Sequence, residues 1–201
     1  MLRSPSMQPG NDTRPPAAPK LTYNDFLSFP DDGQRHELID AEHFVTPSSA
    51  TVHQRLVGAL HLALGNVLKA TRLGEVFVAP FDVVLSDHDV VEPDLLVVLA
   101  DQAGILTDQN VRGAPAIVVE IVSPGTRRRD ETLKRRLYER AGVREYWIVD
   151  PDGETIEVCR PAARKPDRTI VLAATAGHVL TSPLLPGFEV PLRNLFATPR
   201  G

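Results

Sequence analysis

Apolar residues recur at helical spacing in two segments of the chain. In the first segment, the apolar residues that would lie on one face of a helix are Val52, Leu56, Val57, Leu60, Ala63, Leu64, Val67 and Leu68. Their period of about 3.6 residues predicts a long amphipathic helix, for which Ser48 and Ser49 are candidate N-caps. A second helix is predicted between residues 123 and 145, and it ends at Ala141 because Gly142 follows as a C-cap.

Strand-like runs of β-branched and aliphatic residues fill much of the remaining chain. A short helix after the N-cap Thr22 precedes a predicted hairpin over residues 35–39 and 42–45. Further strands are predicted over residues 75–85 (interrupted at Pro80), 92–99, 116–123, 145–150, 155–160 and 169–174, with a polar loop over 161–168. Helices and strands do not alternate strictly. The predicted fold class is therefore α/β, with a mixed β-sheet that includes antiparallel pairs and is flanked by helices.

The composition is that of a globular chain. It has 201 residues, of which 42% are hydrophobic and 24% charged, enough for one domain with a substantial core. Residues 1–20 contain five prolines, so we expect a disordered leader there and a single domain over residues 21–197. No apolar run reaches roughly eighteen residues and no secretory signal is visible, so we expect a cytoplasmic protein that does not enter a membrane. The single cysteine, Cys159, excludes an internal disulfide and a thiolate zinc site.

Basic residues are concentrated in the segment that contains the second helix. Residues 127–144 hold eight basic and three acidic side chains, a balance of +5 in a chain whose net charge is −4. This pattern fits a solvated helix with intrahelical ion pairs, and it also fits an anion-binding face. The sequence lacks a Walker loop, a GxGxxG motif and a complete HExxH motif, which excludes the commonest nucleotide and zinc sites.

Two carboxylates lie within strongly apolar predicted strands. Alternation along the strand places Glu120 on the same face as Val118 and Val122, and Asp94 opens another apolar run. Burial of an unpaired carboxylate costs several kcal/mol. Two such acids on neighbouring strands repel each other unless a cation or a proton lies between them. Either acid could instead cap a strand end or pair with an arginine of the basic segment.

A lysine of the second predicted helix lies on its apolar face. At about 100° per residue, Lys134 falls between Leu137 and Tyr138 on the apolar arc. A core-facing lysine in the helix that follows the Glu120 strand needs a negative partner, and the two carboxylates are the nearest candidates. In the alternative interpretation the side chain snorkels, and its ammonium group reaches solvent beyond Tyr138.

Several motifs along the chain resemble those of one family. They are Glu92-Pro93-Asp94-Leu95, the segment from Val119 to Pro124, the segment from Thr126 to Lys134, and the tryptophan strand from Glu145 to Pro151. Together with His36-Glu37-Leu38-Ile39-Asp40 they resemble the Uma-two family of restriction-endonuclease-like proteins, in the PD-(D/E)XK nuclease superfamily. The resemblance covers about residues 20–197. It implies a restriction-endonuclease-like mixed sheet flanked by helices, and a metal-dependent endonuclease that hydrolyses DNA phosphodiester bonds.

The resemblance also implies a metal site and a catalytic lysine. Asp94 and Glu120 would bind magnesium, with manganese as a substitute, together with the main-chain carbonyl of Ile121. Lys134 would position the attacking water or help to deprotonate it. It would replace the usual lysine of the superfamily, because that position is occupied by Val122 in this chain.

Further expectations follow from the same resemblance. Glu37 would be a catalytic acid that supports a second metal or its water. Arg127, Arg128 and Arg129 would contact nucleic-acid phosphates. Ala41 departs from the pattern, since similar sequences often have glycine at this turn. DNA is the expected partner and a homodimer the expected assembly.

Other interpretations stay open from the sequence. A protein with the same fold could bind nucleic acid in a regulatory role with weak or no turnover, which the acidic net charge and the displaced lysine allow. A hydrolase could also use the same metal on a different phosphate ester. His53, on the apolar face of the first helix, is either a buried structural histidine or a neighbour of the site.

Overall fold

The computed structural model describes residues 20–46, 50–162 and 165–197. The predicted leader therefore lies outside the described residues except for its last position, Lys20. The helical elements are α1 (Tyr23–Phe26), α2 (Thr51–Thr71), the 3₁₀ segment η1 (Ala100–Ile105), α3 (Arg127–Arg129), the π-helical turn η2 (Asp130–Lys134), α4 (Arg135–Ala141) and α5 (Leu192–Leu195). The strands are β1 (Arg35–Ile39), β2 (Glu42–Thr46), β3 (Gly74–Val78), β4 (Val83–Ser86), β5 (Asp89–Val91), β6 (Leu95–Leu99), β7 (Val111–Arg112), β8 (Ile117–Ile121), β9 (Glu145–Asp150), β10 (Thr155–Ala162), β11 (Lys165–Ala173), β12 (Val179–Thr181) and β13 (Glu189–Pro191).

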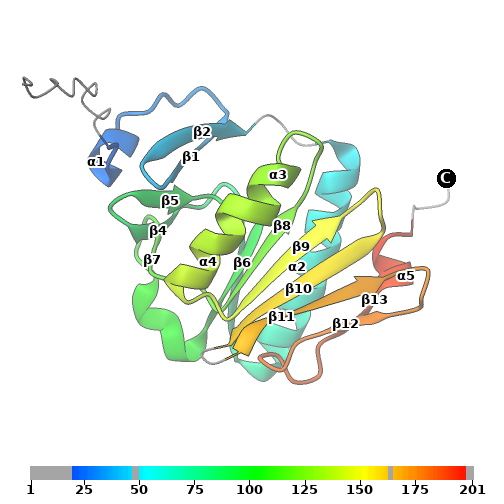
Figure 1. Cartoon of the computed structure of the whole chain (residues 1–201). Coiled ribbons are helices and arrows are strands. Elements are labelled where there is room, and N and C mark those ends of the chain that lie inside the picture. The colour runs from blue at the N-terminus through cyan, green and yellow to red at the C-terminus, as the bar shows by residue number, and fades with distance from the viewer. Residues whose placement is uncertain (1–19, 47–49, 163–164, 198–201) are drawn as a thin grey trace, which may run out of the picture.

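A six-stranded sheet forms the centre of the fold (Figure 1). Its strand order is β11-β10-β9-β8-β6-β3, in which β8 and β9 are parallel and the other neighbours are antiparallel. A second sheet has the order β2-β1-β5-β4-β7, and β12 pairs with β13. The mixed α/β class is confirmed. The described strands are, however, divided among three sheets rather than gathered in one.

The two principal helical segments cover opposite faces of the six-stranded sheet (Figure 1). On one face, α2 packs Leu56, Leu60, Leu64 and Leu68 against Val97, Val119 and Trp147. On the other face, α4 packs Leu137 and Tyr138 against Val118, Tyr146 and Ile148. Alternate residues of β8 therefore face two different cores, as expected for a strand buried on both sides.

The long helix α2 confirms the predicted apolar stripe except at Val52, which is exposed, and does not confirm the predicted cap. Its N-cap is Ala50, which makes no side-chain capping bond, while Ser48 and Ser49 lie outside the described residues. The helix ends at Thr71, where Arg72 takes the left-handed conformation with φ 56°. Over the described ranges, no helix has both the length and the apolar character needed to cross a membrane.

The hairpin β1–β2 has the predicted turn, and β2 extends one residue further than expected. Asp40 and Ala41 occupy the two turn positions with φ 52° and 66°, as a two-residue hairpin turn requires. Alanine in this left-handed region costs about 1 kcal/mol because its Cβ approaches the following carbonyl oxygen. The departure from glycine at position 41 is therefore a source of local strain.

Two sequence predictions about the strands are wrong. The run over 75–85 divides into β3 and β4, which belong to different sheets. The polar loop predicted over 161–168 is largely strand, since β10 continues to Ala162 and β11 begins at Lys165. An antiparallel ladder joins backbone groups and needs no apolar side chains, so the polar composition of this segment did not indicate where pairing stops.

Candidate active site

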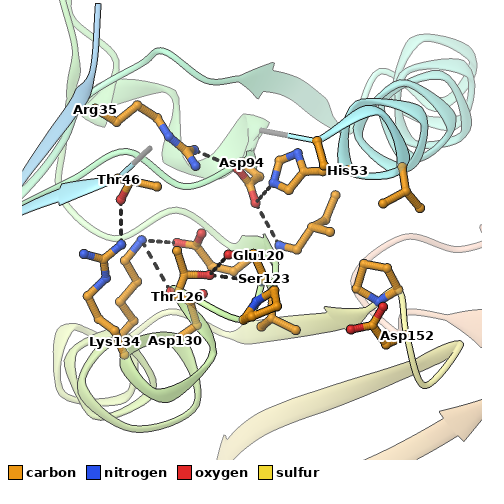
Figure 2. Close-up of a pocket in the computed structure, with 17 residues that line it drawn as sticks. Arg35, Thr46, His53, Asp94, Glu120, Ser123, Thr126, Asp130, Lys134 and Asp152 are labelled. Carbon is orange, nitrogen blue, oxygen red and sulfur yellow. Dashed lines mark hydrogen bonds and ion pairs between the residues drawn. The ribbon is translucent and has the colours of Figure 1, made fainter. Parts of the chain in front are cut away.

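A pocket of about 310 Å³ opens beside the carboxyl end of β8 (Figure 2). The hairpin β1–β2, the start of α2 and the helical segment after β8 all contribute to its walls. The charged side chains that line it are Arg35, Asp94, Glu120, Arg129, Asp130, Lys134 and Asp152. The pocket thus brings Asp94, Glu120 and Lys134 together, as the sequence predicted.

Glu120 lies on β8 and faces the α4 side of the sheet, with Val118 and Val122 in the same core. Its Oε1 accepts hydrogen bonds from Lys134 Nζ at 2.8 Å and from the Tyr138 hydroxyl at 2.9 Å. Burial raises the pKa of Glu120 to about 8 despite the lysine, and the neighbouring carboxylates add to the effect. The position predicted from strand alternation is confirmed.

Lys134 is buried, with 2% of its surface exposed, so the snorkelling interpretation is wrong. Besides Glu120, its ammonium contacts Glu37 Oε1 at 2.6 Å and lies 3.9 Å from Asp130 Oδ1. Burial alone would lower the pKa of Lys134, but the carboxylates of Glu120, Glu37 and Asp130 outweigh it and raise the pKa above its ordinary value. Lys134 is therefore an ammonium at neutral pH.

A π-helical turn presents Lys134 and Asp130 to the pocket. The turn η2 runs from Asp130 to Lys134, and both of these end residues are buried. Turns of this type widen the helix locally and occur frequently at functional sites. Asp130 Oδ1 is buried without a hydrogen-bond partner among the described residues, and burial raises the pKa of this carboxyl.

Asp94 precedes β6 and has three donors around its carboxylate. Arg35 Nη1 donates to Oδ1 at 2.7 Å, while the main-chain N–H of Ile121 at 2.8 Å and His53 Nε2 at 3.0 Å contact Oδ2. Burial would raise the pKa of Asp94, but the bond from His53 and the charge of Arg35 outweigh it, so the pKa is lowered. Its basic partner thus comes from β1 and not from the segment 127–144.

Glu37 lies on β1, two residues after Arg35 and on the same face of the strand. It is 1% exposed. Its Oε1 contacts the ammonium of Lys134 and accepts a hydrogen bond from the backbone N–H of Glu92 at 3.1 Å. Its Oε2 lies 3.6 Å from Arg129 Nη2. The predicted supporting acid is therefore in direct contact with the predicted catalytic lysine.

The three consecutive arginines after β8 point to different places. Arg127 makes a bidentate pair with Asp150 at 2.8 and 2.9 Å, and Arg128 is exposed. Arg129 turns inward, where its Nη2 donates to Thr46 Oγ1 at 2.6 Å. Only Arg129 of the three lines the pocket.

Sequence reasoning missed three charged residues that line the pocket, Arg35, Asp130 and Asp152. Arg35 alternates with Glu37 along β1, and this period of two was the available signal. Asp130 stands four residues before Lys134, a spacing that places two helical side chains on one face. His53, left open by the sequence, lies at the site through its contact with Asp94.

The charges of the site do not balance. Within the described residues, four buried carboxylates (Glu37, Asp94, Glu120 and Asp130) meet three permanent cations (Arg35, Arg129 and Lys134), with the His53 imidazole as a further partner of Asp94. Burial is the main cause of the raised pKa of Glu120, and the surrounding carboxylates add to it although a lysine touches the group. The site can therefore accept an additional cation or a proton.

The donor set fits magnesium, although it is not a complete protein cage. Over the described ranges, no three His, Cys, Asp or Glu side chains are arranged to hold a metal by themselves. Magnesium, however, usually takes only one or two carboxylates and completes its shell with water and substrate phosphate. A carboxylate offers about four lone-pair sites. In the contacts described above, Glu120 Oε2 accepts no hydrogen bond, and the three donors around Asp94 leave one of its lone-pair sites for a metal ion.

Comparison with known proteins agrees with the fold and the motifs. Residues 23–193 match the family model Uma2, described as "Putative restriction endonuclease". A crystal structure from Anabaena variabilis, described as a "putative nuclease belonging to DUF820", superimposes with a TM-score of 0.73 at 20% sequence identity. The alignment covers 88% of this chain and 97% of that one, and at this identity it shows a shared fold. A search of curated proteins found no match. Because the family model spans most of the chain, the chain belongs to the Uma2 family of restriction-endonuclease-like proteins.

Proposed function

We propose that the protein is a magnesium-dependent endonuclease that hydrolyses phosphodiester bonds of DNA. The observation that carries the proposal is the excess of one buried carboxylate at a pocket lined by both Asp94 and Glu120. An excess of buried negative charge costs free energy unless a cation joins the site, and the oxygen-rich donor set suits a hard divalent ion. The proposal includes a cytoplasmic homodimer that acts on DNA.

In this proposal, Asp94, Glu120 and the main-chain carbonyl of Ile121 hold the magnesium ion, and manganese can replace it. When bound, the ion supplies an acidified water and neutralises negative charge on the phosphate. His53 and the N–H of Ile121 fix the orientation of the Asp94 carboxylate through its Oδ2. Tyr138 fixes Glu120 in the same way, through Oε1.

Lys134 acts as a hydrogen-bond donor and fixed positive charge. Its raised pKa keeps it protonated at neutral pH, which favours positioning of the attacking water over removal of its proton. The ammonium stabilises negative charge that develops on the phosphate oxygens. Glu37 holds Nζ at 2.6 Å and so restricts where the ammonium can lie.

The test is cleavage of supercoiled plasmid DNA by the full chain with magnesium, with manganese, and with EDTA. We expect nicking or linearisation that requires the metal, and loss of it in Glu120→Gln and in Asp94→Asn. Both changes remove one charge with little change in side-chain volume. The exposed residue Glu189 on β13 provides a matched control, and Glu189→Gln should cleave like the parent.

A second measurement separates metal binding from turnover. Magnesium that binds the folded state raises its melting temperature in proportion to RT ln(1 + [L]/Kd). The shift should be present in the parent and in Glu189→Gln and absent in Glu120→Gln. DNA that stays intact under every metal condition, or a Glu120→Gln variant as active as the parent, contradicts the proposal.

A second candidate function is regulatory binding of nucleic acid without turnover. One observation favours it: Arg35 and His53 already occupy the oxygens of Asp94, so the site holds an internal cation where the metal is expected. Binding in a gel-shift assay that survives EDTA and does not change in Asp94→Asn, together with absent cleavage, would select this alternative.

A further inference from the structure

The hairpin β1–β2 presents two polar side chains side by side at the rim of the pocket. Arg35 and Thr46 are directly opposed in the antiparallel register, so they lie on one face of the hairpin with Cβ atoms about 5 Å apart. Figure 2 shows both reaching toward the pocket from the same side. Thr46 is also the residue that accepts the hydrogen bond from Arg129, so a second guanidinium joins this group.

Arg35 has donors to spare in this position. Its bonds to Asp94 Oδ1 and to the carbonyl of Glu92 both use Nη1. Among the described residues, none accepts a hydrogen bond from Nη2 or Nε, and 22% of the side chain is exposed. Nε and Nη2 form one edge of the guanidinium, and this fork matches two oxygens of a phosphate group.

Arg129 is held in place with its charge incompletely balanced. Its shortest contact is to a neutral hydroxyl, that of Thr46, while Glu37 lies 3.6 Å away and is already paired with Lys134 at 2.6 Å. Its Nε is buried with no hydrogen-bond partner in the part of the chain that the structure describes. The ring of Phe44, with its centroid 5.5 Å from the guanidinium carbon, fixes the plane of the group.

A second hollow of about 600 Å³ adjoins the first, and Arg35, Thr46, His53 and Asp94 line both. A strand that places one phosphate in the first pocket can therefore continue into the second along Arg35. A phosphate of the continuing strand then passes the free edge of this guanidinium.

We infer that Arg35 and Arg129, on either side of Thr46, form a phosphate-binding subsite for the nucleic-acid backbone beside the candidate cleavage site. The inference rests on the proposed function, and it adds Arg35 and Thr46, which the sequence did not indicate, to the phosphate contact expected of Arg129. The subsite reads no bases, since its donors suit phosphate oxygens. It predicts binding that depends strongly on salt and weakly on sequence.

The experiment measures fluorescence anisotropy of a labelled oligonucleotide, single-stranded and duplex, titrated with the full chain in EDTA at several salt concentrations. Arg35→Gln and Arg129→Gln should each weaken binding by about tenfold at low salt and reduce the slope of log K against log salt by about 0.7–0.9. Arg144→Gln is the matched control. Arg144 is a more exposed ion-paired arginine just before β9, at the opposite end of the parallel pair β8–β9 from Glu120.

A further variant guards against loss of folding. Arg35→Gln leaves the buried carboxylate of Asp94 without its cation, whereas Arg35→Lys keeps a positive charge there and removes the fork. We expect Arg35→Lys to melt near the parent temperature and to bind several-fold more weakly. If Arg35→Lys and Arg129→Gln bind the oligonucleotide with the affinity and the salt slope of the parent, the inference is overturned. The proposed function still stands in that case, provided that the same preparations cleave plasmid DNA. A parent that binds neither oligonucleotide also overturns it, and a parent that in addition fails to cleave overturns both.

Discussion

Replacement of Lys134 by methionine tests the charge balance of the buried site directly. Methionine is similar in length and uncharged, so the change removes the ammonium without opening a large cavity. It leaves Glu37 and Glu120, which lie 2.6 and 2.8 Å from Nζ, buried without their cation. Removal of one partner from a buried ion pair costs about 3–5 kcal/mol. We expect a loss of that size near pH 8, a large part of the roughly 5–15 kcal/mol that stabilises a typical domain.

The penalty of Lys134→Met should depend on pH with a definite sign. The ammonium lowers the pKa of Glu120, so its removal raises this pKa further above the value of about 8 found with lysine present. A folded-state pKa above the unfolded value of about 4.5 means that the folded protein binds the extra proton, and stability falls as the pH rises between the two values. The penalty should therefore shrink as the pH falls from the variant's higher pKa toward about 8, by up to about 1.4 kcal/mol per pH unit, and level off below about pH 8, where Glu120 is protonated in both folded proteins.

Urea unfolding of the parent and of Lys134→Met, at pH values near 9.5, near 8 and near 6.5, measures both effects. The double variant Lys134→Met with Glu120→Gln should recover part of the loss, because the glutamine needs no cation. Lys69, exposed in the last turn of α2, supplies the control, and Lys69→Met should change stability by less than about 0.5 kcal/mol. The reasoning is refuted if Lys134→Met is as stable as Lys69→Met near pH 8, or if its penalty grows as the pH falls.

Three smaller changes test separate contacts by urea unfolding. Tyr138→Phe removes the hydroxyl that donates to Glu120 at 2.9 Å and should cost about 1 kcal/mol near neutral pH, and a neutral result would contradict that bond. Arg127→Gln should cost less than about 1 kcal/mol, since its pair with Asp150 is partly exposed. The bond from Arg127 lowers the pKa of Asp150, so this difference should be full near neutral pH and disappear as the pH falls through the lowered pKa. Ala41→Gly should stabilise the protein by about 0.5 kcal/mol, because glycine takes the positive φ of 66° without steric cost, and a destabilising effect would contradict strain at this turn.

The contact between Glu120 and Lys134 could be predicted from the sequence because both positions follow from local geometry. Strand alternation fixed the face of Glu120, and helical rotation fixed the face of Lys134. Each charge is costly to bury alone, so the burial of either one predicted that a group of opposite charge lies beside it. The angle calculated for a regular helix remained adequate although η2 is π-helical, since Lys134 and Leu137 are both buried on the side of the six-stranded sheet.

The partner of Asp94 could not be predicted in this way. Arg35 lies 59 positions earlier in the chain and reaches Asp94 because β1 belongs to a separate sheet that meets the first beside the pocket. Local periodicity gives the faces of strands but not the edge at which two sheets meet. The same limit explains why the run over 75–85 was read as one interrupted strand, since only tertiary pairing sends β3 and β4 to different sheets.

The strand β1 links the two sheets through charges of opposite sign. Arg35 complements Asp94 at one side of the pocket, and Glu37 complements Lys134 at the other. Because these two residues are separated by a single position, their side chains move together with the hairpin. A slip of β1 by one residue would turn both charges to the opposite face and leave Asp94 and Lys134 short of counter-charge at once. The register of β1 is therefore fixed by the chemistry of the site as well as by its own ladder. A substitution that loosens the hairpin should accordingly disturb the site even where it touches neither carboxylate.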